Sequence, residues 1–253
     1  MITYTQLGKN GRLGNQMFQY ATLASVGLTR GYQVGIPKNQ QISRVFKLKN
    51  AEYVDDLNVE RVYREKEFLF DANIFLIPDN VDINGYFQSG NYFSHCEDFI
   101  RKEFEFQDHI KEKASSILKN YQNTLLCAVH VRRGDYKNLS HYHTNLGSEY
   151  YVPACSLVYN NIPNIKFLVF SDDIEWCKNA FKDEKFNVID TNDDAVDLCI
   201  MSQCQAHVIA NSSFSWWGAW LSRSSAVVAP KQWFGPEGPK NWESVYQQGW
   251  VLV

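Results

Sequence analysis

From residue 125 to residue 230 the chain alternates short apolar runs with longer segments, and this alternation limits the choice of fold more than any other feature. The runs are continuous rather than interrupted by polar residues, and they lie at 125–131, 166–171, 187–190, 206–210 and 226–230. Helix-length segments separate them at 149–160, 174–182, 194–205 and 214–223. Continuous Val-, Ile- and Leu-rich strands between helices are typical of a parallel sheet that is covered on both faces.

The N-terminal part begins with a unit of the same kind. The predicted elements are a strand at 2–7, a glycine-rich loop at 8–15, a helix at 16–30 that Gly31 ends, and a strand at 32–36 before Pro37. Between 38 and 120 the sequence predicts a strand and turn over 82–93, a helix from about 94 and a helix over about 108–120. For 253 residues we predict an α/β protein of two lobes, 1–121 and 122–253.

The charge and the apolar pattern exclude several classes of partner. The formal net charge is −3 without any block of like charges, so bulk attraction to nucleic acid is not expected and any anion site must be local. No apolar stretch approaches the roughly 20 residues of a membrane span, and no signal-like segment follows Met1. We expect a cytoplasmic protein without a transmembrane segment, for which a peripheral association with a membrane stays open.

The six cysteines are scattered and contain no C-x-x-C pair. They are therefore expected to be small core residues in a reducing compartment rather than disulfides or zinc ligands.

Polar clusters follow three of the predicted strands, and the cluster in "HVRRGDY" (130–136) is the most informative. Arginine presents a planar fork of donors that stays charged, so Arg132 and Arg133 suit a phosphate or pyrophosphate. Asp135 would orient an arginine or act as a base. The alternative is a structural Arg–Asp pair at the end of a strand. Because ligands bind at the carboxyl edge of open parallel sheets, we expect the three clusters to converge there.

The other two clusters are "FSDD" (170–173) and "IANSS" (209–213). Asp172 is a candidate ligand for a nucleobase edge, a ribose or a metal, whereas Asp173 is a candidate helix cap. Asn211, Ser212 and Ser213 would either cap the next helix or present hydroxyl and N–H groups to a phosphate. The tryptophans that follow are predicted to be core residues. Asp194 and Asp197 are interpreted as the acidic first turn of another helix.

The loop "NGRLGNQ" (10–16) supplies a second candidate anion site. Gly11 and Gly14 let the backbone approach a ligand, and Arg12 and Asn15 lie at the start of a helix whose N–H groups attract anions. A plain tight turn is the alternative. His141 and His143 are isolated, and the sequence contains neither H-E-x-x-H nor D-x-D, so we predict no metal site. A bound pyrophosphate would then be neutralised by arginines and helix N-termini.

Three motifs, "GRLGNQMFQYA" (11–21), "HVRRGDY" (130–136) and "IANSSFSWWGAWL" (209–221), together resemble the α-1,2-fucosyltransferases of glycosyltransferase family eleven. The loop and the arginine pair are also similar to motifs of the α-1,6- and protein O-fucosyltransferases. The resemblance implies a GT-B fold, with two Rossmann-like lobes, parallel sheets and a donor cleft between them. It implies a metal-independent, inverting transfer of L-fucose from GDP-β-L-fucose to the 2-hydroxyl of a galactose-terminated glycan, with no cofactor and a role in polysaccharide biosynthesis.

The same resemblance implies roles for single residues. Arg132 would grip the pyrophosphate, His130 and Asp172 would lie near guanosine, and Ser212 and Ser213 near the β-phosphate. Arg12 and Asn15 would approach from the N-terminal lobe, and acceptor recognition would fall within 38–120. The implied donor-binding set is His130, Arg132, Arg133, Asp172, Asn211, Ser212, Ser213 and Gly14, and the implied catalytic set is Arg132, Asp135, Asn15 and Arg12. The rival interpretations are another GDP-sugar transferase of this fold and a non-catalytic nucleotide-sugar-binding module.

Overall fold

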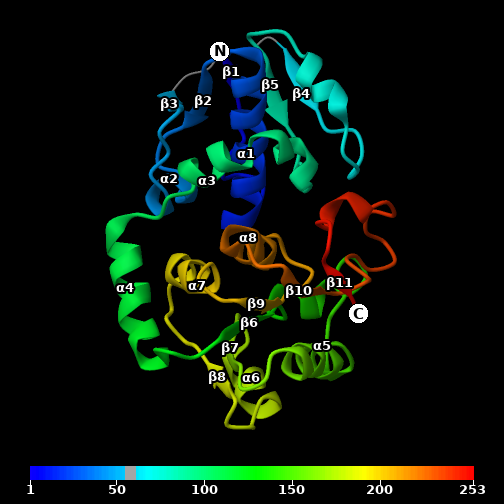
Figure 1. The fold of residues 1–253 in the computed structure, drawn as a ribbon. Coiled ribbons are helices and arrows are strands. Elements are labelled where there is room, and N and C mark those ends of the chain that lie inside the picture. Colours follow the sequence, from blue (N-terminus) through cyan, green and yellow to red (C-terminus); the bar gives the residue numbers. More distant parts are fainter. Residues whose placement is uncertain (55–60) are drawn as a thin grey trace. The chain divides into compact units, whose positions relative to one another are not determined.

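The computed structural model describes residues 1–54 and 61–253. The chain forms two compact units, each built on a parallel sheet (Figure 1). Unit 1 contains Met1–Gln107 and Asn241–Gln247, and unit 2 contains Asp108–Lys240 and Gln248–Val253. Both units are α/β, as the sequence predicts.

The sheet of unit 1 has the strand order β3-β2-β1-β5-β4, and each of its described strand pairs is parallel. Its elements are β1 (Ile2–Thr3), α1 (Leu13–Arg30), β2 (Val34–Pro37), α2 (Gln41–Val45), β3 (Ala51–Val54), β4 (Val62–Arg64), β5 (Asp82–Asn84) and α3 (Glu97–Glu103), with 3-10 turns at Ala72–Leu76, Gly90–Tyr92, Ser94–Cys96 and Glu243–Val245. Helix α1 is buried along nearly its whole length and ends, as predicted, at Gly31, whose φ of 68° closes the helix with an N–H bond to the Gly27 carbonyl.

The sheet of unit 2 has the order β11-β10-β9-β6-β7-β8, again with parallel pairs throughout the described strands. Its elements are α4 (Asp108–Leu118), β6 (Leu126–Val131), α5 (Ser148–Asn161), β7 (Lys166–Ser171), α6 (Ile174–Ala180), β8 (Phe186–Val188), α7 (Asp194–Met201), β9 (Ala206–Val208), α8 (Ser213–Ser222), β10 (Ala226–Ala229) and β11 (Val251–Leu252), with 3-10 turns at Lys119–Tyr121 and Asp135–Asn138. The alternation seen in the sequence is thus confirmed.

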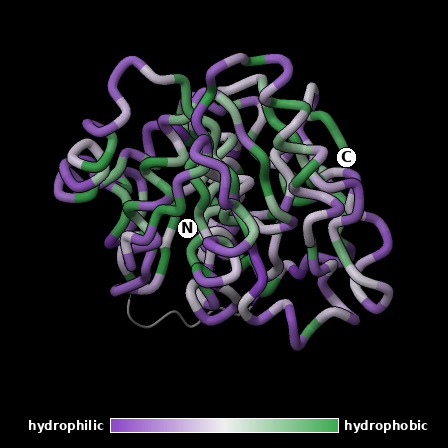
Figure 2. The backbone as a smooth tube through the Cα atoms, turned by 90° about the horizontal axis from the view of Figure 1, so that it is seen from below, coloured by the Kyte–Doolittle hydropathy of each residue, from purple (hydrophilic) through white to green (hydrophobic). Residues whose placement is uncertain are grey.

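Helices cover both faces of the unit 2 sheet, with α5 and α6 on one side and α7 and α8 on the other (Figure 1). Every residue of β6 is buried, which explains its uninterrupted apolar sequence. The predicted core role of the tryptophans is confirmed, because Trp216 and Trp217 are fully buried and Trp220 nearly so. All six cysteines are free thiols, and five of them are buried. Hydrophilic stretches mark many of the outer loops (Figure 2).

Three strands were not predicted from the sequence: β3, β4 and β11. Strand β3 (AEYV) and strand β4 (VYR) carry charged residues and are partly exposed at the two edges of their sheet, so they lack the apolar signal of a buried strand. The division into units also differs by one helix from the expected lobes. Helix α4 packs against α7 and belongs to unit 2, whereas the late segment Asn241–Gln247 belongs to unit 1, where Ser89 Oγ donates to the Ser244 carbonyl at 2.7 Å.

No helix among residues 1–54 and 61–253 is long and apolar enough to span a membrane.

Glu103, which is 1% exposed, joins three segments of unit 1. It accepts hydrogen bonds from the Tyr20 hydroxyl, from the Lys49 and Asn50 amides at 3.2 and 3.1 Å and from Asn50 Nδ2 at 2.6 Å. Replacing it with alanine leaves the buried Tyr20 hydroxyl unsatisfied and removes the acceptor of the Lys49 and Asn50 donors, so we expect a loss of about 3 kcal/mol in the free energy of unfolding, measured by urea denaturation. Glu97→Ala on the same helix loses only a single, long contact with Arg101 at 3.5 Å, and as the control it should cost less than about 1 kcal/mol. Equal effects of the two variants would contradict this interpretation.

Candidate functional site

The three polar clusters meet at the carboxyl edge of the unit 2 sheet, as the sequence predicts. Strands β9, β6 and β7 are direct neighbours, and each cluster begins where one of them ends. The segment after β6 contacts the segment after β7 through Asp172, and it contacts the segment after β9 through the Tyr136 hydroxyl, which donates to the Asn211 carbonyl at 3.1 Å. The clusters therefore form one continuous polar edge.

Arg132 lies between two carboxylates. Its Nη1 is 2.9 Å from Asp172 Oδ2, and its Nη2 contacts both oxygens of Asp135 at 2.7 and 2.9 Å. The guanidinium also lies 5.3 Å from the centre of the Tyr136 ring. The side chain is only 16% exposed, so its position is fixed by these partners before any ligand arrives.

Asp172 holds the turn after β6. One of its oxygens, Oδ1, accepts the amide hydrogens of Arg133 and Gly134 at 2.9 and 3.0 Å. This approach requires glycine, because a Cβ on Gly134 would lie 2.7 Å from Asp172 Oδ2. Burial would raise the pKa of Asp172, but the two amides and the Arg132 guanidinium outweigh it and lower the pKa. The carboxylate is therefore ionised.

Arg133 and Asp173 form a second pair beside the first. The Arg133 guanidinium stacks 4.2 Å from the centre of the Trp176 ring, and its Nε is 3.4 Å from Asp173 Oδ2. Asp173 also pairs with Lys137. This contact is the main cause of the lowered pKa of Asp173, and the Trp176 amide and Arg133 contribute less. Asp173 is the N-cap of α6 and accepts from the Trp176 amide at 3.4 Å, so the capping interpretation is confirmed.

His130, the fifth residue of β6, is buried at the same edge. Its ring packs against Phe214 at 5.4 Å between centroids, and its Nδ1 has no hydrogen-bond partner among the described residues. Burial, together with the Arg132 charge, lowers the pKa of His130 to about 3. The imidazole is neutral at physiological pH, and its Nδ1 can donate or accept a hydrogen bond with a ligand.

The segment after β9 begins helix α8. Ser212 is the N-cap, and its hydroxyl accepts from the Phe214 amide at 3.3 Å, while Ser213 is half-buried in the first turn. Asn211 is 1% exposed, and its Nδ2 donates to the Thr144 and Trp233 carbonyls at 2.9 and 2.8 Å. The amide nitrogen of Asn211 therefore ties two loops together.

The remaining predicted site residues lie in unit 1, at the start of α1. Arg12 is the N-cap residue of that helix and is exposed, whereas Gly14 is buried within the first turn. Asn15 Oδ1 accepts a hydrogen bond from Gln88 Nε2 at 2.8 Å. The predicted helix thus begins at Leu13, earlier than expected, and the glycine-rich loop precedes it at the carboxyl edge of the unit 1 sheet.

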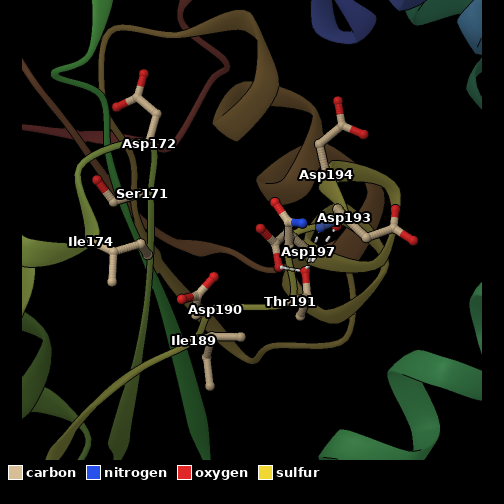
Figure 3. Close-up of a pocket in the computed structure, with 10 residues that line it drawn as sticks. Ser171, Asp172, Ile174, Ile189, Asp190, Thr191, Asp193, Asp194 and Asp197 are labelled. Atoms are coloured by element: carbon tan, nitrogen blue, oxygen red, sulfur yellow. Dashed lines mark hydrogen bonds between the residues drawn. The ribbon is translucent and has the colours of Figure 1, made fainter.

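An acidic cavity of about 560 Å³ opens beside Asp172, and sequence reasoning did not find it. Figure 3 shows Asp172, directly after β7, on one side and Asp193, Asp194 and Asp197, at the start of α7, on the other. The full lining is Ser171, Asp172, Ile174, Ile189, Asp190, Thr191, Asn192, Asp193, Asp194 and Asp197. The available signal was the run "DTNDD" (190–194), which begins at the last residue of the predicted strand 187–190.

Asp197 is the most perturbed carboxyl group of this cavity. It accepts from the Thr191 hydroxyl at 2.7 Å, yet burial and the neighbouring aspartates raise its pKa to about 7. Its place in the first turn of α7 is as predicted, but its burial against the cavity was not. Among residues 1–54 and 61–253, no three His, Cys, Asp or Glu side chains group as ligands for a metal ion.

Comparison with known proteins agrees with this geometry. The model of glycosyl transferase family 11 matches residues 2–253. The chain belongs to this family. An alpha-1,2-colitosyltransferase of Escherichia coli is 29% identical and covers 96% of both chains. The O-antigen biosynthesis glycosyltransferase WbnK of Escherichia coli is 29% identical, over 89% of this chain and 93% of that one. Human galactoside alpha-(1,2)-fucosyltransferase 1 is 26% identical, over 86% of this chain and 65% of that one.

Solved structures of fucosyltransferases share the fold. NodZ from Bradyrhizobium superposes with a TM-score of 0.61 at 11% sequence identity, over 95% of this chain and 96% of that one. POFUT1 in complex with GDP superposes with a TM-score of 0.59 at 12% identity, over 99% and 97% of the two chains. This glycosyltransferase therefore has the two-lobed GT-B fold that the sequence resemblance implies.

The raised pKa of Asp197 predicts that its charge destabilises the fold at neutral and alkaline pH. Because the pKa is about 7 in the folded state and near 3.8 in the unfolded chain, stability falls as pH rises from about 4 to 7. Asp197→Asn keeps the acceptor for Thr191 and removes the charge. We expect its stability gain over the wild type to grow by about 1–3 kcal/mol between pH 5 and pH 8, measured by urea denaturation.

Asp194→Asn, on the exposed side of the same helical turn, removes one of the charges that raise the pKa of Asp197 and should show a smaller gain in the same direction. A gain for Asp197→Asn that does not change with pH would contradict the buried-charge interpretation.

Proposed function

We propose that this glycosyltransferase transfers L-fucose from GDP-β-L-fucose to the 2-hydroxyl of a galactoside, forming an α-1,2 linkage. The observation that carries the proposal is the division of charge at one sheet edge. Arg132 pairs with Asp172, Arg133 and Lys137 pair with the adjacent Asp173, and Asp172 also lines the acidic cavity. A nucleoside diphosphate complements this arrangement, because its diphosphate is anionic and suits the cations, and its base has N–H donors that suit the acidic cavity.

The acidic cavity favours guanine over the other common bases. The pairing edge of guanine presents adjacent N1–H and N2–H donors, and an ionised carboxylate such as that of Asp172 is an acceptor. Uracil offers a single N–H flanked by carbonyl oxygens, which this carboxylate would repel. His130, whose buried Nδ1 has no protein partner among the described residues, supplies a further polar contact for the nucleoside.

The diphosphate would lie against Arg132 and the first turn of α8. A buried, prepositioned guanidinium stabilises the charge that grows on the β-phosphate as the bond to fucose breaks. The Ser212 and Ser213 hydroxyls add donors, and the positive end of the α8 dipole favours the diphosphate charge. In this proposal Arg133 mainly holds the turn through Trp176 and Asp173, and Asn211 holds neighbouring loops. Arg12, Asn15 and Gly14, assigned by the family resemblance, complete the proposed donor contacts.

The proposed reaction inverts the anomeric carbon without a metal ion. The carbon–oxygen bond to GDP breaks with its electron pair leaving on the β-phosphate, and an oxocarbenium-like fucosyl centre forms. The acceptor hydroxyl attacks from the opposite face, and its proton passes to water. Cations and helix N–H groups neutralise the departing diphosphate, which is the work a divalent ion performs in other transferases.

We infer that Asp135 orients Arg132 rather than acting as the general base. Both of its oxygens already contact Arg132 Nη2, which fits an orienting group better than a group waiting for an acceptor hydroxyl.

A second donor is supported by one comparison. The colitosyltransferase relative is named for colitose, which is L-fucose without its 3-hydroxyl, so GDP-colitose is the alternative donor. The two candidates differ at a single hydroxyl and share the same nucleotide site.

The deciding experiment incubates the purified protein with GDP-β-L-fucose or GDP-colitose and with lactose or methyl β-D-galactopyranoside, each with and without EDTA. Transfer that survives EDTA, with an α-1,2 linkage established by NMR of the product, supports the proposal. No transfer to either galactoside would overturn it, and strict dependence on added metal would overturn the metal-independent mechanism. A higher kcat/KM with GDP-colitose than with GDP-β-L-fucose would make GDP-colitose the donor.

Arg132→Ala should lower kcat/KM by about 100-fold or more and weaken GDP binding measured by calorimetry, because the developing phosphate charge loses its main partner. Arg132→Lys should fail to a similar degree, since an ammonium group cannot pair with Asp135 and Asp172 at once. Arg30→Ala, at the exposed end of α1, is the charge-matched control and should be near normal. Near-normal turnover of Arg132→Ala would contradict the assignment.

Asp135→Asn separates the two roles of that residue. An asparagine oxygen still accepts from Arg132, so an orienting role predicts a loss of about tenfold in kcat with an unchanged pH profile. A general base would instead lose about 100- to 10,000-fold and its acid limb would disappear from the pH profile. Steady-state kinetics from pH 5 to 9 distinguish these outcomes.

A further inference from the structure

The turn that follows β5 in unit 1 presents one aromatic ring to solvent. Gly85 follows the last residue of β5, and Tyr86, the next residue, is 44% exposed although it lies at the carboxyl edge of the sheet. Single exposed aromatic residues are common and need no explanation by themselves. Here, however, the turn that carries the ring is fixed by buried and half-buried groups on several sides.

Gly85 is held from two directions. Its amide donates to the Tyr4 hydroxyl at 3.0 Å, and its carbonyl accepts from that hydroxyl and from Gln19 Nε2 at 3.3 Å. The same Gln19 nitrogen donates to the Asn10 carbonyl at 3.0 Å, which joins the turn to the glycine-rich loop. A Cβ on Gly85 would lie 2.4 Å from Glu65 Cβ, so the close packing requires glycine.

Glu65, directly after β4, fixes the next two residues. Its Oε2 and Oε1 accept the amide hydrogens of Tyr86 and Phe87 at 2.6 and 2.9 Å. Burial raises the pKa of Glu65, and these two amides partly offset that rise. The half-buried carboxylate of Glu65 thus fixes two consecutive backbone amides of one turn.

Phe87 is in a strained conformation. Its φ is +51°, which is unfavourable for a bulky residue, yet the side chain is fully buried and packs edge-on against Tyr4 and Tyr92. Such strain persists where the surroundings fix the backbone, and it is concentrated at functional sites. Its effect here is to send Phe87 into the core while Tyr86 stays outside.

The surroundings of the turn are polar. Gln88, two residues after Tyr86, donates to Asn15 at 2.8 Å, so the amides of α1 and the turn lie together at this edge. An exposed ring beside amide and carboxylate groups has the composition of a carbohydrate subsite. One face of galactose, where the axial 4-hydroxyl points away, is a patch of C–H groups that stacks on an aromatic ring, and the hydroxyls of the sugar bond to neighbouring polar groups.

We propose that Tyr86 is the stacking platform for the acceptor galactoside and that Glu65 is the positioning residue that holds it. This inference rests on the proposed function and adds to it the residue that selects the acceptor. It predicts discrimination by the galacto configuration, since the equatorial 4-hydroxyl of glucose interrupts the C–H patch.

The test is steady-state kinetics with methyl β-D-galactopyranoside as acceptor. Tyr86→Ala should raise its KM about tenfold, which corresponds to about 1.4 kcal/mol, while kcat and the KM of the donor change less than about twofold. Tyr86→Phe keeps the ring and should be near normal. Tyr53→Ala, an equally exposed tyrosine (43%) on the opposite edge strand β3, is the matched control and should have no effect.

Glu65→Gln tests the positioning role. An amide accepts from only one of the two backbone N–H groups, so the acceptor KM should rise severalfold with kcat unchanged. In the Tyr86→Ala background the same change should add less than about twofold, because the ring it positions is gone. Independent, multiplying effects of the two changes on the acceptor KM would show that Glu65 does not act through Tyr86 and would overturn the positioning role.

Failure of this inference is distinguishable from failure of the proposed function. If the wild type transfers no sugar to galactosides, the proposed function fails first. If the wild type is active and Tyr86→Ala keeps a normal acceptor KM, or loses donor affinity instead, the platform is overturned while the proposed function stands.

Discussion

The carboxylate of Asp172 holds together the polar edge of unit 2. One of its oxygens bonds to two consecutive amides after β6, and the other pairs with Arg132. Because these bonds keep the carboxylate ionised and the turn closed, Arg132 is fixed between Asp172 and Asp135 without any ligand. An arginine fixed in this way needs little reorganisation when negative charge develops beside it, which is the requirement for electrostatic catalysis.

The fold explains why these groups meet. Parallel strands end at the same edge, so residues that are far apart in the chain, such as Arg132, Asp172 and Ser212, come from neighbouring strands β6, β7 and β9. The same edge carries a second, acidic environment at the start of α7. Asp197 is kept there at a cost to stability, since its raised pKa means that the folded protein disfavours its charge. Retention of a destabilising carboxylate beside a cavity is typical of a binding residue.

Unit 1 uses a different physical device at the equivalent edge of its own sheet. Glu65, Tyr4 and Gln19 hold a short turn from several sides, and the strain at Phe87 is offset by its burial. Hydrogen bonds to the backbone thus determine which aromatic ring is buried and which is exposed. The two units share an architecture but fix their functional residues by different means, an ion-pair network in unit 2 and a clamped turn in unit 1.

The sequence by itself determined the fold class, the parallel strands of unit 2, the helices between them and the polar edge with Arg132 and Asp172, because periodicity, strand ends and motifs are local properties of the chain. It also determined the family, through three motifs whose residues the structure brings to sheet edges. Edge strands β3 and β4 escaped prediction because exposed strands lack an apolar signal. Only the tertiary structure decided that Asp172 binds the turn after β6, that Asp197 lies against a cavity, and that Tyr86 is exposed while Phe87 is buried. Each of these depends on contacts between segments distant in the sequence, and neither a pKa nor an exposure is set by the residue alone.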